Sequence, residues 1–260
     1  MAEDHLRGLV LGDGPGVPLL LIHGFPLDGR MWNPQRLALA AGRRVLIPDL
    51  LGFGSTPLPQ GPCSLERQAD SLAAFATAHG ADRVVACGLS MGGYIALAFA
   101  ERFPTRLAGL ILADTRASGD SEVVSQARGL NALRVLRDGV GFVVDEMLPK
   151  MFHASLPSRS GALEHEVQTI MLSQRPEAVA AALQAMRDRP SREGVLESLE
   201  CPARIIVGAG DRVTPPEEAM AMAALNKRTS VTVIPEAGHL SNMEAPAAFN
   251  EGVLSFLAAL

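Results

Sequence analysis

The sequence has little cysteine. The three cysteines, Cys63, Cys87 and Cys201, are widely spaced, odd in number and form no Cys-x-x-Cys pair. This pattern excludes a disulfide framework and a cysteine zinc site. We expect three reduced thiols in a cytoplasmic protein without a metal site.

Long hydrophobic runs are also missing. The apolar run at Val17–Ile22 contains Pro18 and is far too short to span a bilayer. The first residues, Met1–Leu11, carry Glu3, Asp4 and Arg7 and lack the basic start and apolar stretch of a signal peptide. We therefore expect no membrane partner and a cytoplasmic location.

A dense stripe of basic residues is absent as well. The chain has 23 Lys and Arg against 28 Asp and Glu, which gives a formal net charge of -5. Nucleic-acid binding therefore has little electrostatic support. The composition, with 48% hydrophobic and 20% charged residues, is that of a globular protein and leaves monomer and homo-oligomer equally open.

Short apolar runs alternate with helical patterns along the 260 residues. This alternation predicts a mostly parallel sheet with helices on both faces, because such strands lack a polar side. Helical spacing appears at 64–79, 91–102, 217–225 and 246–260. The predicted strands are residues 19–22, 44–47, 83–87, 107–112, 204–207 and 231–234.

The stretch 115–198 has a different pattern. It contains amphipathic segments at 121–137, 142–151, 163–173 and 176–186 and no convincing strand. We predict a helical cap (lid) insertion at 115–198 over the carboxyl edge of a core formed by 1–114 and 199–260. Ligands bind at that edge in open α/β sheets.

One serine lies in a turn suited to nucleophilic attack. Gly88-Leu89-Ser90-Met91-Gly92 follows an apolar strand and opens an apolar helix, which is the context that a nucleophile elbow requires. Glycines on both sides allow strand and helix to crowd together. The alternative reading is a tight turn with a capping serine.

A serine nucleophile needs a base and an orienting carboxylate. His239 follows the last apolar run, on a loop from which a base could reach Ser90. Asp211, after the fifth run, completes the order Ser, Asp, His and is our candidate acid; Asp114, after the fourth run, is its rival. Among the other histidines, we interpret His5 and His79 as surface residues. His153 and His165 lie in the predicted cap.

The negative charge of a tetrahedral intermediate needs backbone donors. We expect them at Met91, directly after the nucleophile, and at Phe25, after His23-Gly24. His23 itself is interpreted as a brace of the oxyanion loop, not as the base.

These motifs resemble the α/β-hydrolase fold superfamily, and within it small bacterial carboxylesterases and the 3-oxoadipate enol-lactonase group. The resemblance implies a mostly parallel sheet flanked by helices, with a helical cap inserted after the sixth core strand. It also implies Ser90, Asp211 and His239 as a triad and Phe25 and Met91 as oxyanion donors. It is carried by His23-Gly24-Phe25-Pro26, Asp49–Ser55, Gly88–Gly93, Gly210-Asp211 and Gly238-His239.

The predicted function is hydrolysis of a small-molecule carboxylic ester or lactone through an acyl-enzyme, with no cofactor. Three alternatives stay open: perhydrolysis (haloperoxidase activity) on the same triad, hydrolysis of a carbon–carbon bond, and a non-enzymatic ligand-binding module. Serine at the nucleophile position argues against families that use aspartate there.

Aromatic residues are scarce, at 4%, so aliphatic and methionine side chains must supply the pocket. We expect Leu89 and Met147 to contact substrate and Arg116 to be the candidate for binding a carboxylate, with Lys150 and Arg134 as weaker candidates. Several cap residues either line the pocket or pack the cap onto the sheet, and packing is the preferred reading: Leu130, Leu133, Val143, Val144, Met147, Leu148, Met151 and Phe152.

Overall fold

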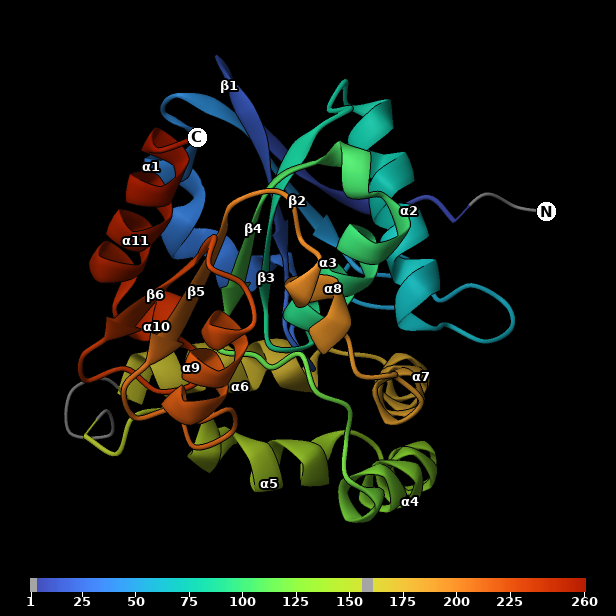
Figure 1. The fold of residues 1–260 in the computed structure, drawn as a ribbon. Coiled ribbons are helices and arrows are strands. Elements are labelled where there is room, and N and C mark those ends of the chain that lie inside the picture. The colour runs from blue at the N-terminus through green and yellow to red at the C-terminus, as the bar shows by residue number, and fades with distance from the viewer. Residues whose placement is uncertain (1–3, 156–160) are drawn as a thin grey trace.

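The computed structural model describes residues 4–155 and 161–260. Six strands form one sheet in the order β2-β1-β3-β4-β5-β6, and only the β1–β2 pair is antiparallel (Figure 1). The predicted mostly parallel sheet is therefore confirmed. The strands are β1 (Arg7–Ile22), β2 (Arg43–Asp49), β3 (Val84–Leu89), β4 (Leu107–Ala113), β5 (Ala203–Gly208) and β6 (Thr229–Ile234).

Strand β1 extends well beyond the predicted residues 19–22. Its first half pairs with β2 from Arg7 to Leu11, and after several register shifts Leu19 and Leu20 pair with the same strand. The first half is mostly exposed, whereas Leu19–Ile22 are buried. The sequence pattern therefore showed only the buried half of this strand.

Helices cover both faces of the sheet. The short helices η1 (Gly29–Gln35) and α1 (Arg36–Ala40) and the C-terminal α11 (Pro246–Ala258) lie on one side, and α2 (Leu65–Ala78) and α3 (Met91–Arg102) on the other (Figure 1). Ser64 caps the N-terminus of α2, since its hydroxyl accepts a hydrogen bond from the Arg67 N–H at 3.2 Å. The remaining short elements are η2 (Pro104–Arg106), α8 (Glu193–Glu197), α9 (Pro216–Ala224) and α10 (Ser241–Glu244).

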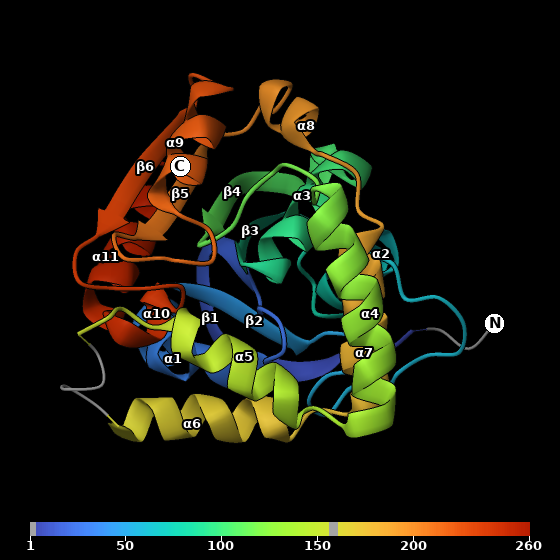
Figure 2. The ribbon, with the colours of Figure 1, turned by 90° about the horizontal axis from the view of Figure 1, so that it is seen from below.

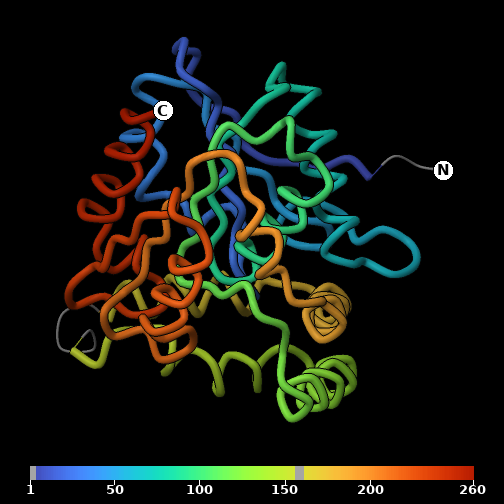
Figure 3. The backbone as a smooth tube through the Cα atoms, viewed as in Figure 1, coloured from blue at the N-terminus to red at the C-terminus, as the bar shows by residue number. Residues whose placement is uncertain are grey.

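Four helices between β4 and β5 form what we call the helical insertion: α4 (Glu122–Asp138), α5 (Gly141–Met151), α6 (Gly161–Leu172) and α7 (Pro176–Arg187). They lie across the end of the sheet at which β4 finishes (Figures 1 and 2). The chain trace passes through them before it returns to β5 (Figure 3). The division into a core and a separate cap stays a prediction; α8, which fell inside the predicted cap, packs against α3.

The position of the insertion needs one correction in strand count. The resemblance implied an insertion after the sixth core strand, but the insertion follows β4, the fourth strand of the described chain. Strand β1 is a single long strand whose two halves both pair with β2, which accounts for one of the two strands by which the counts differ. No helix among the described residues has the length and apolar character needed to cross a membrane.

Candidate active site

Ser90 sits in a strained turn between β3 and α3. Its φ of 54° is positive, and its N–H donates to the Ala113 carbonyl at 2.9 Å. A Cβ on Gly88 would lie 2.1 Å from the Gly92 carbonyl oxygen, and one on Gly92 would lie 2.1 Å from that of Ile22. Both flanking glycines are therefore required by close backbone approach, which is why the Gly-x-Ser-x-Gly pattern appears in the sequence.

The structure brings Ser90, His239 and Asp211 together. The Ser90 Oγ lies 2.9 Å from His239 Nε2, and His239 Nδ1 lies 2.9 Å from Asp211 Oδ2. His239 and Asp211 are buried, whereas Ser90 is partly exposed. Because an ionised carboxylate can only accept, Nδ1 carries the ring proton and Nε2 is left to accept from the serine hydroxyl.

Asp211 is held as a carboxylate. Burial raises its pKa, but the facing His239 ring and the hydrogen bonds from Thr214 outweigh burial and bring the pKa below its ordinary value. The Val213 and Thr214 N–H groups donate to Oδ1 at 2.8 and 3.0 Å, and the Thr214 hydroxyl donates to Oδ2 at 2.7 Å. The loop after β5 thus orients the carboxylate before it meets the imidazole.

Asp114, the rival acid, is engaged elsewhere. Its Oδ1 accepts from the Gly208 N–H at 2.8 Å, and its Oδ2 accepts from the Ser241 hydroxyl at 2.5 Å. Complete burial, followed by the charge of Asp211, raises its pKa well above the ordinary value. The two oxygens of Asp114 therefore tie β4 to β5 and to α10.

The two expected oxyanion donors flank the serine. Met91 is the first residue of α3, so its N–H is one of the free donors at a helix N-terminus. The loop that carries Phe25 passes close by, since a Cβ on Gly24 would lie 3.5 Å from that of Ser90. Among the residues described, neither N–H has a hydrogen-bond acceptor within the protein.

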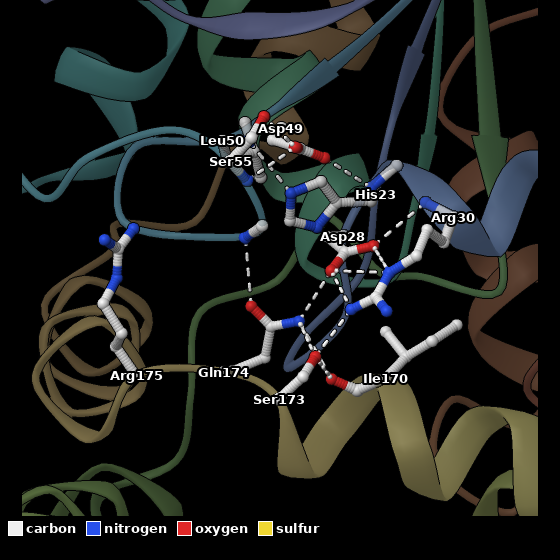
Figure 4. Close-up of polar contacts among 12 residues, drawn as sticks. His23, Asp28, Arg30, Asp49, Leu50, Ser55, Ile170, Ser173, Gln174 and Arg175 are labelled. Carbon is white, nitrogen blue, oxygen red and sulfur yellow. Dashed lines mark hydrogen bonds and ion pairs between the residues drawn. The ribbon is translucent and has the colours of Figure 1, made fainter.

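His23 fastens this loop (Figure 4). Its Nε2 accepts from the Leu50 N–H at 3.0 Å, so the proton lies on Nδ1 and donates to the Gly24 carbonyl at 3.0 Å. Burial lowers the pKa of His23 and keeps the ring neutral. Both ring nitrogens are occupied by backbone, which agrees with a bracing role and leaves no free nitrogen for base catalysis.

A cavity of about 290 Å³ lies between Phe25 and the helical insertion. Met147 is on its wall, whereas Leu89 and Arg116 are not among the described residues that line it. The apolar part of the wall includes Phe25, Val124, Ala127, Val143, Met147 and Leu183.

The expectation for the other apolar cap residues is only partly correct. The buried ones pack within the fold as the preferred reading required: Val144, Leu148, Met151 and Phe152. The expectation is wrong for Leu130 and Leu133, whose exposed fractions are 69% and 65%. Helix α4 buries Ala132 and Val135 on its inner face, which turns these two leucines outward.

Arg116, the candidate for binding a carboxylate, faces acidic groups of the protein. Its guanidinium nitrogens lie 4.0 Å from an Asp120 oxygen and 3.9 Å from a Glu218 oxygen. Arg134 pairs with Glu146 at 3.1 Å, and Lys150 is exposed on α5. The structure thus does not bring these cations to the cavity wall.

Sequence reasoning missed several residues that support the site. Thr115 donates its hydroxyl hydrogen to the Ser90 carbonyl at 2.8 Å. His153 of the insertion contacts the glycines that precede Asp211 and His239. The signal was the two glycines themselves, Gly210 and Gly238, because a glycine next to a site residue indicates close approach of another chain segment. In residues 4–155 and 161–260, no cluster of His, Cys, Asp and Glu has the arrangement of a metal site.

Comparison with known proteins places this geometry in context. A sequence model described as the Alpha/beta hydrolase family matches residues 19–251. The structure of a thermophilic esterase from Thermogutta terrifontis, with malate bound, is 41% identical with a TM-score of 0.95, over 98% of this chain and 93% of that one. An enol-lactonase structure from Burkholderia xenovorans LB400 is 26% identical with a TM-score of 0.90, over 97% and 96%.

One curated relative is named neither as an esterase nor as a lactonase. The 2-hydroxy-6-oxo-2,4-heptadienoate hydrolase of Pseudomonas putida is 32% identical, over 95% of this chain and 91% of that protein. Another curated relative is longer, and the chain spans 66% of its length. The superfamily resemblance is confirmed, and an enol-lactonase is among the similar structures, while the relatives differ in the bond they are named for.

Proposed function

The chain belongs to the Alpha/beta hydrolase family, and we propose that it is a serine hydrolase of short, uncharged carboxylic esters or lactones. The observation that carries this proposal is the continuous chain Ser90–His239–Asp211, with 2.9 Å at both links. These distances are those of a nucleophile hydrogen-bonded to its base and a base hydrogen-bonded to its orienting carboxylate.

In the proposed mechanism, the Ser90 oxygen attacks the ester carbonyl carbon while His239 Nε2 takes the hydroxyl proton. The Phe25 and Met91 N–H groups donate to the oxyanion of the tetrahedral intermediate. His239 then gives its proton to the leaving alcohol, and an acyl-enzyme forms. A water molecule attacks the acyl carbon, loses its proton to His239, and the acid leaves as Ser90 regains a proton.

The cavity beside Phe25 favours a small apolar group. At about 30 Å³ per water-sized unit, a volume of about 290 Å³ holds on the order of ten non-hydrogen atoms. Arg128, the one guanidinium in the described lining, is already paired with Asp120 at 2.5 Å. The charge of Arg128 is thus already offset by Asp120, and Glu146 adds an acidic side chain to the same lining, which supports uncharged substrates.

The names of similar proteins support a hydrolase and leave two candidate bonds for cleavage, an ester bond and a carbon–carbon bond. The esterase at 41% identity supports ester cleavage. The dienoate hydrolase at 32% identity supports carbon–carbon cleavage as the second candidate. Perhydrolysis would use the same residues with peroxide in place of water, and a peroxide-dependent bromination assay distinguishes it.

The test is Ser90→Ala on a panel of p-nitrophenyl esters of graded length, an enol-lactone and a dienoate diketone. We expect short-ester turnover to fall by about 10⁵-fold or more, because the nucleophile is lost while binding remains. Ser90 should also be labelled by a fluorophosphonate probe. Near-wild-type hydrolysis by the variant, free of host esterase, would contradict the proposal, and absence of labelling would favour a binding module.

A further inference from the structure

The helical insertion touches the core at the residues directly before the acid and the base. A Cβ on Gly238 would lie 2.4 Å from the His153 N and 2.5 Å from the Phe152 carbonyl carbon. A Cβ on Gly210 would lie 2.3 Å from Cδ2 of the His153 ring. Phe152 and His153, directly after α5, are therefore packed between the loop that presents Asp211 and the loop that presents His239.

One carboxylate joins these segments. Glu244 Oε1 accepts from the Gly238 N–H at 2.8 Å, and Oε2 accepts from the His153 N–H at 2.8 Å. Burial raises the pKa of Glu244, and the backbone donors of His153 and Gly238 oppose that rise. The half-buried carboxylate thus connects the insertion to the residue next to His239.

Three further hydrogen bonds strengthen the same junction. The Leu240 N–H donates to the Met151 carbonyl at 3.2 Å, and the Arg212 guanidinium donates to the Phe152 carbonyl at 3.3 Å and to that of Pro149. Leu240 follows His239 and Arg212 follows Asp211. Each of these three bonds therefore has its core end within one residue of the proposed acid or base.

A second set of hydrogen bonds connects the insertion to the loop after β1 (Figure 4). Gln174, between α6 and α7, donates from Nε2 to Asp28 Oδ2 at 2.8 Å and accepts at Oε1 from the Gly54 N–H at 3.1 Å. Both side chains are buried, with exposed fractions of 4% and 1%. Asp28 belongs to the loop that carries Phe25, so these hydrogen bonds hold the loop of the expected oxyanion donor.

We propose that the helical insertion is a positioning element for the reaction, with Glu244 setting the place of His239 and Gln174 setting the place of the oxyanion loop. The inference rests on the proposed function, because it concerns the same reaction. It adds that the insertion acts on kcat and not only on which substrate enters. Neither residue contacts the reacting atoms; each acts through a loop.

The first test is Glu244→Ala beside Glu244→Gln, assayed on p-nitrophenyl acetate. We expect Glu244→Ala to lower kcat by about 10- to 100-fold, since small displacements of a catalytic group have effects of this size. KM should stay within about twofold. The glutamine keeps one acceptor oxygen and should recover part of the loss, and the rate of Ser90 phosphonylation by a fluorophosphonate should follow the same order.

The second test is Gln174→Leu, which at similar volume removes the hydrogen bonds to Asp28 and Gly54 and also the Nε2 bond to the Ile170 carbonyl. We expect about a 10-fold lower kcat with little change in KM, because the donor at Phe25 is displaced from the developing oxyanion. The same loss should appear for acetate and for longer esters. A loss confined to long esters would instead mark Gln174 as part of the substrate pocket and would overturn its assigned role.

Glu101→Gln is the matched control. Glu101 also bridges two segments, since it accepts from Arg192 at 2.9 Å, but it lies at the far end of α3 from Ser90. We expect unchanged kcat in this variant. Melting temperatures and active-site titration separate folding from positioning for all variants.

The inference is overturned if the Glu244 and Gln174 variants, normalised by active-site titration, have wild-type kcat and differ only in melting temperature. Their hydrogen bonds would then stabilise the fold without positioning the catalytic groups. Failure of the proposed function looks different: the wild type itself would show no Ser90-dependent esterase activity. If Glu244→Ala does not fold, the conservative glutamine variant decides the outcome.

Discussion

The loops at the carboxyl edge of the sheet and the helical insertion above them are built in different ways. The edge loops hold their functional groups by dense hydrogen bonding: Asp211 alone accepts from two backbone N–H groups, a hydroxyl and the His239 ring. The insertion presents to the cavity mainly apolar side chains such as Val143 and Met147.

This difference separates two tasks. Hydrogen bonds are directional, so the edge loops fix the reacting atoms within narrow limits. Apolar contacts are not directional, and methionine adapts its shape, so the cavity wall can accept a range of small groups. We therefore expect substitutions in the loops to change the rate of every substrate and substitutions on the cavity wall to change the ranking among substrates.

The sharpest test within the edge loops compares Asp211→Asn with Asp114→Asn. Both aspartates follow a strand and both are buried. Only Asp211 meets His239, so we expect Asp211→Asn to lower kcat by about 10⁴-fold through the wrong imidazole tautomer. Asp114→Asn should keep kcat within about threefold in the same esterase assay. A large loss for Asp114→Asn and a small one for Asp211→Asn would exchange their roles.

On the insertion side, Met147→Trp fills part of the cavity. We expect kcat/KM for p-nitrophenyl octanoate to fall by about 10-fold or more, because a few lost methylene contacts have this effect. The value for the acetate should stay within about twofold. Leu133→Trp is the control, since this leucine lies on the exposed face of α4. Equal losses for acetate and octanoate would show that the wall does not select by size.

The smallest expected effect concerns pH and stability at Asp114. Its pKa in the folded protein is raised by burial, so the folded state keeps a proton that the unfolded chain has released. The stability linked to this proton is present at low pH and is lost as pH rises through the raised pKa. Asparagine carries no such proton, so we expect the melting temperature of Asp114→Asn to gain about 2–4 °C relative to wild type between pH 5 and pH 9. A difference that does not change with pH would refute a raised pKa for Asp114.

Much of the fold followed from local pattern. Residues 19–22, 84–87 and 205–207 are buried in the sheet, so their continuous apolar character was visible without a structure. The exposed half of β1, Arg7–Leu11, carried no such signal because it gains its partners from β2 and not from burial. Its extent could be learned only from the pairing.

The sequence by itself determined the elbow and the order of the candidate groups, because steric crowding at Gly88 and Gly92 is a local requirement that leaves its mark in residue type. The tertiary structure alone decided between Asp211 and Asp114, turned Leu130 and Leu133 outward, and joined Gln174 to Asp28. The reason is physical. These outcomes depend on distances between side chains far apart along the chain, and a distance of that kind is set by the packing of whole elements rather than by the residues next to each position.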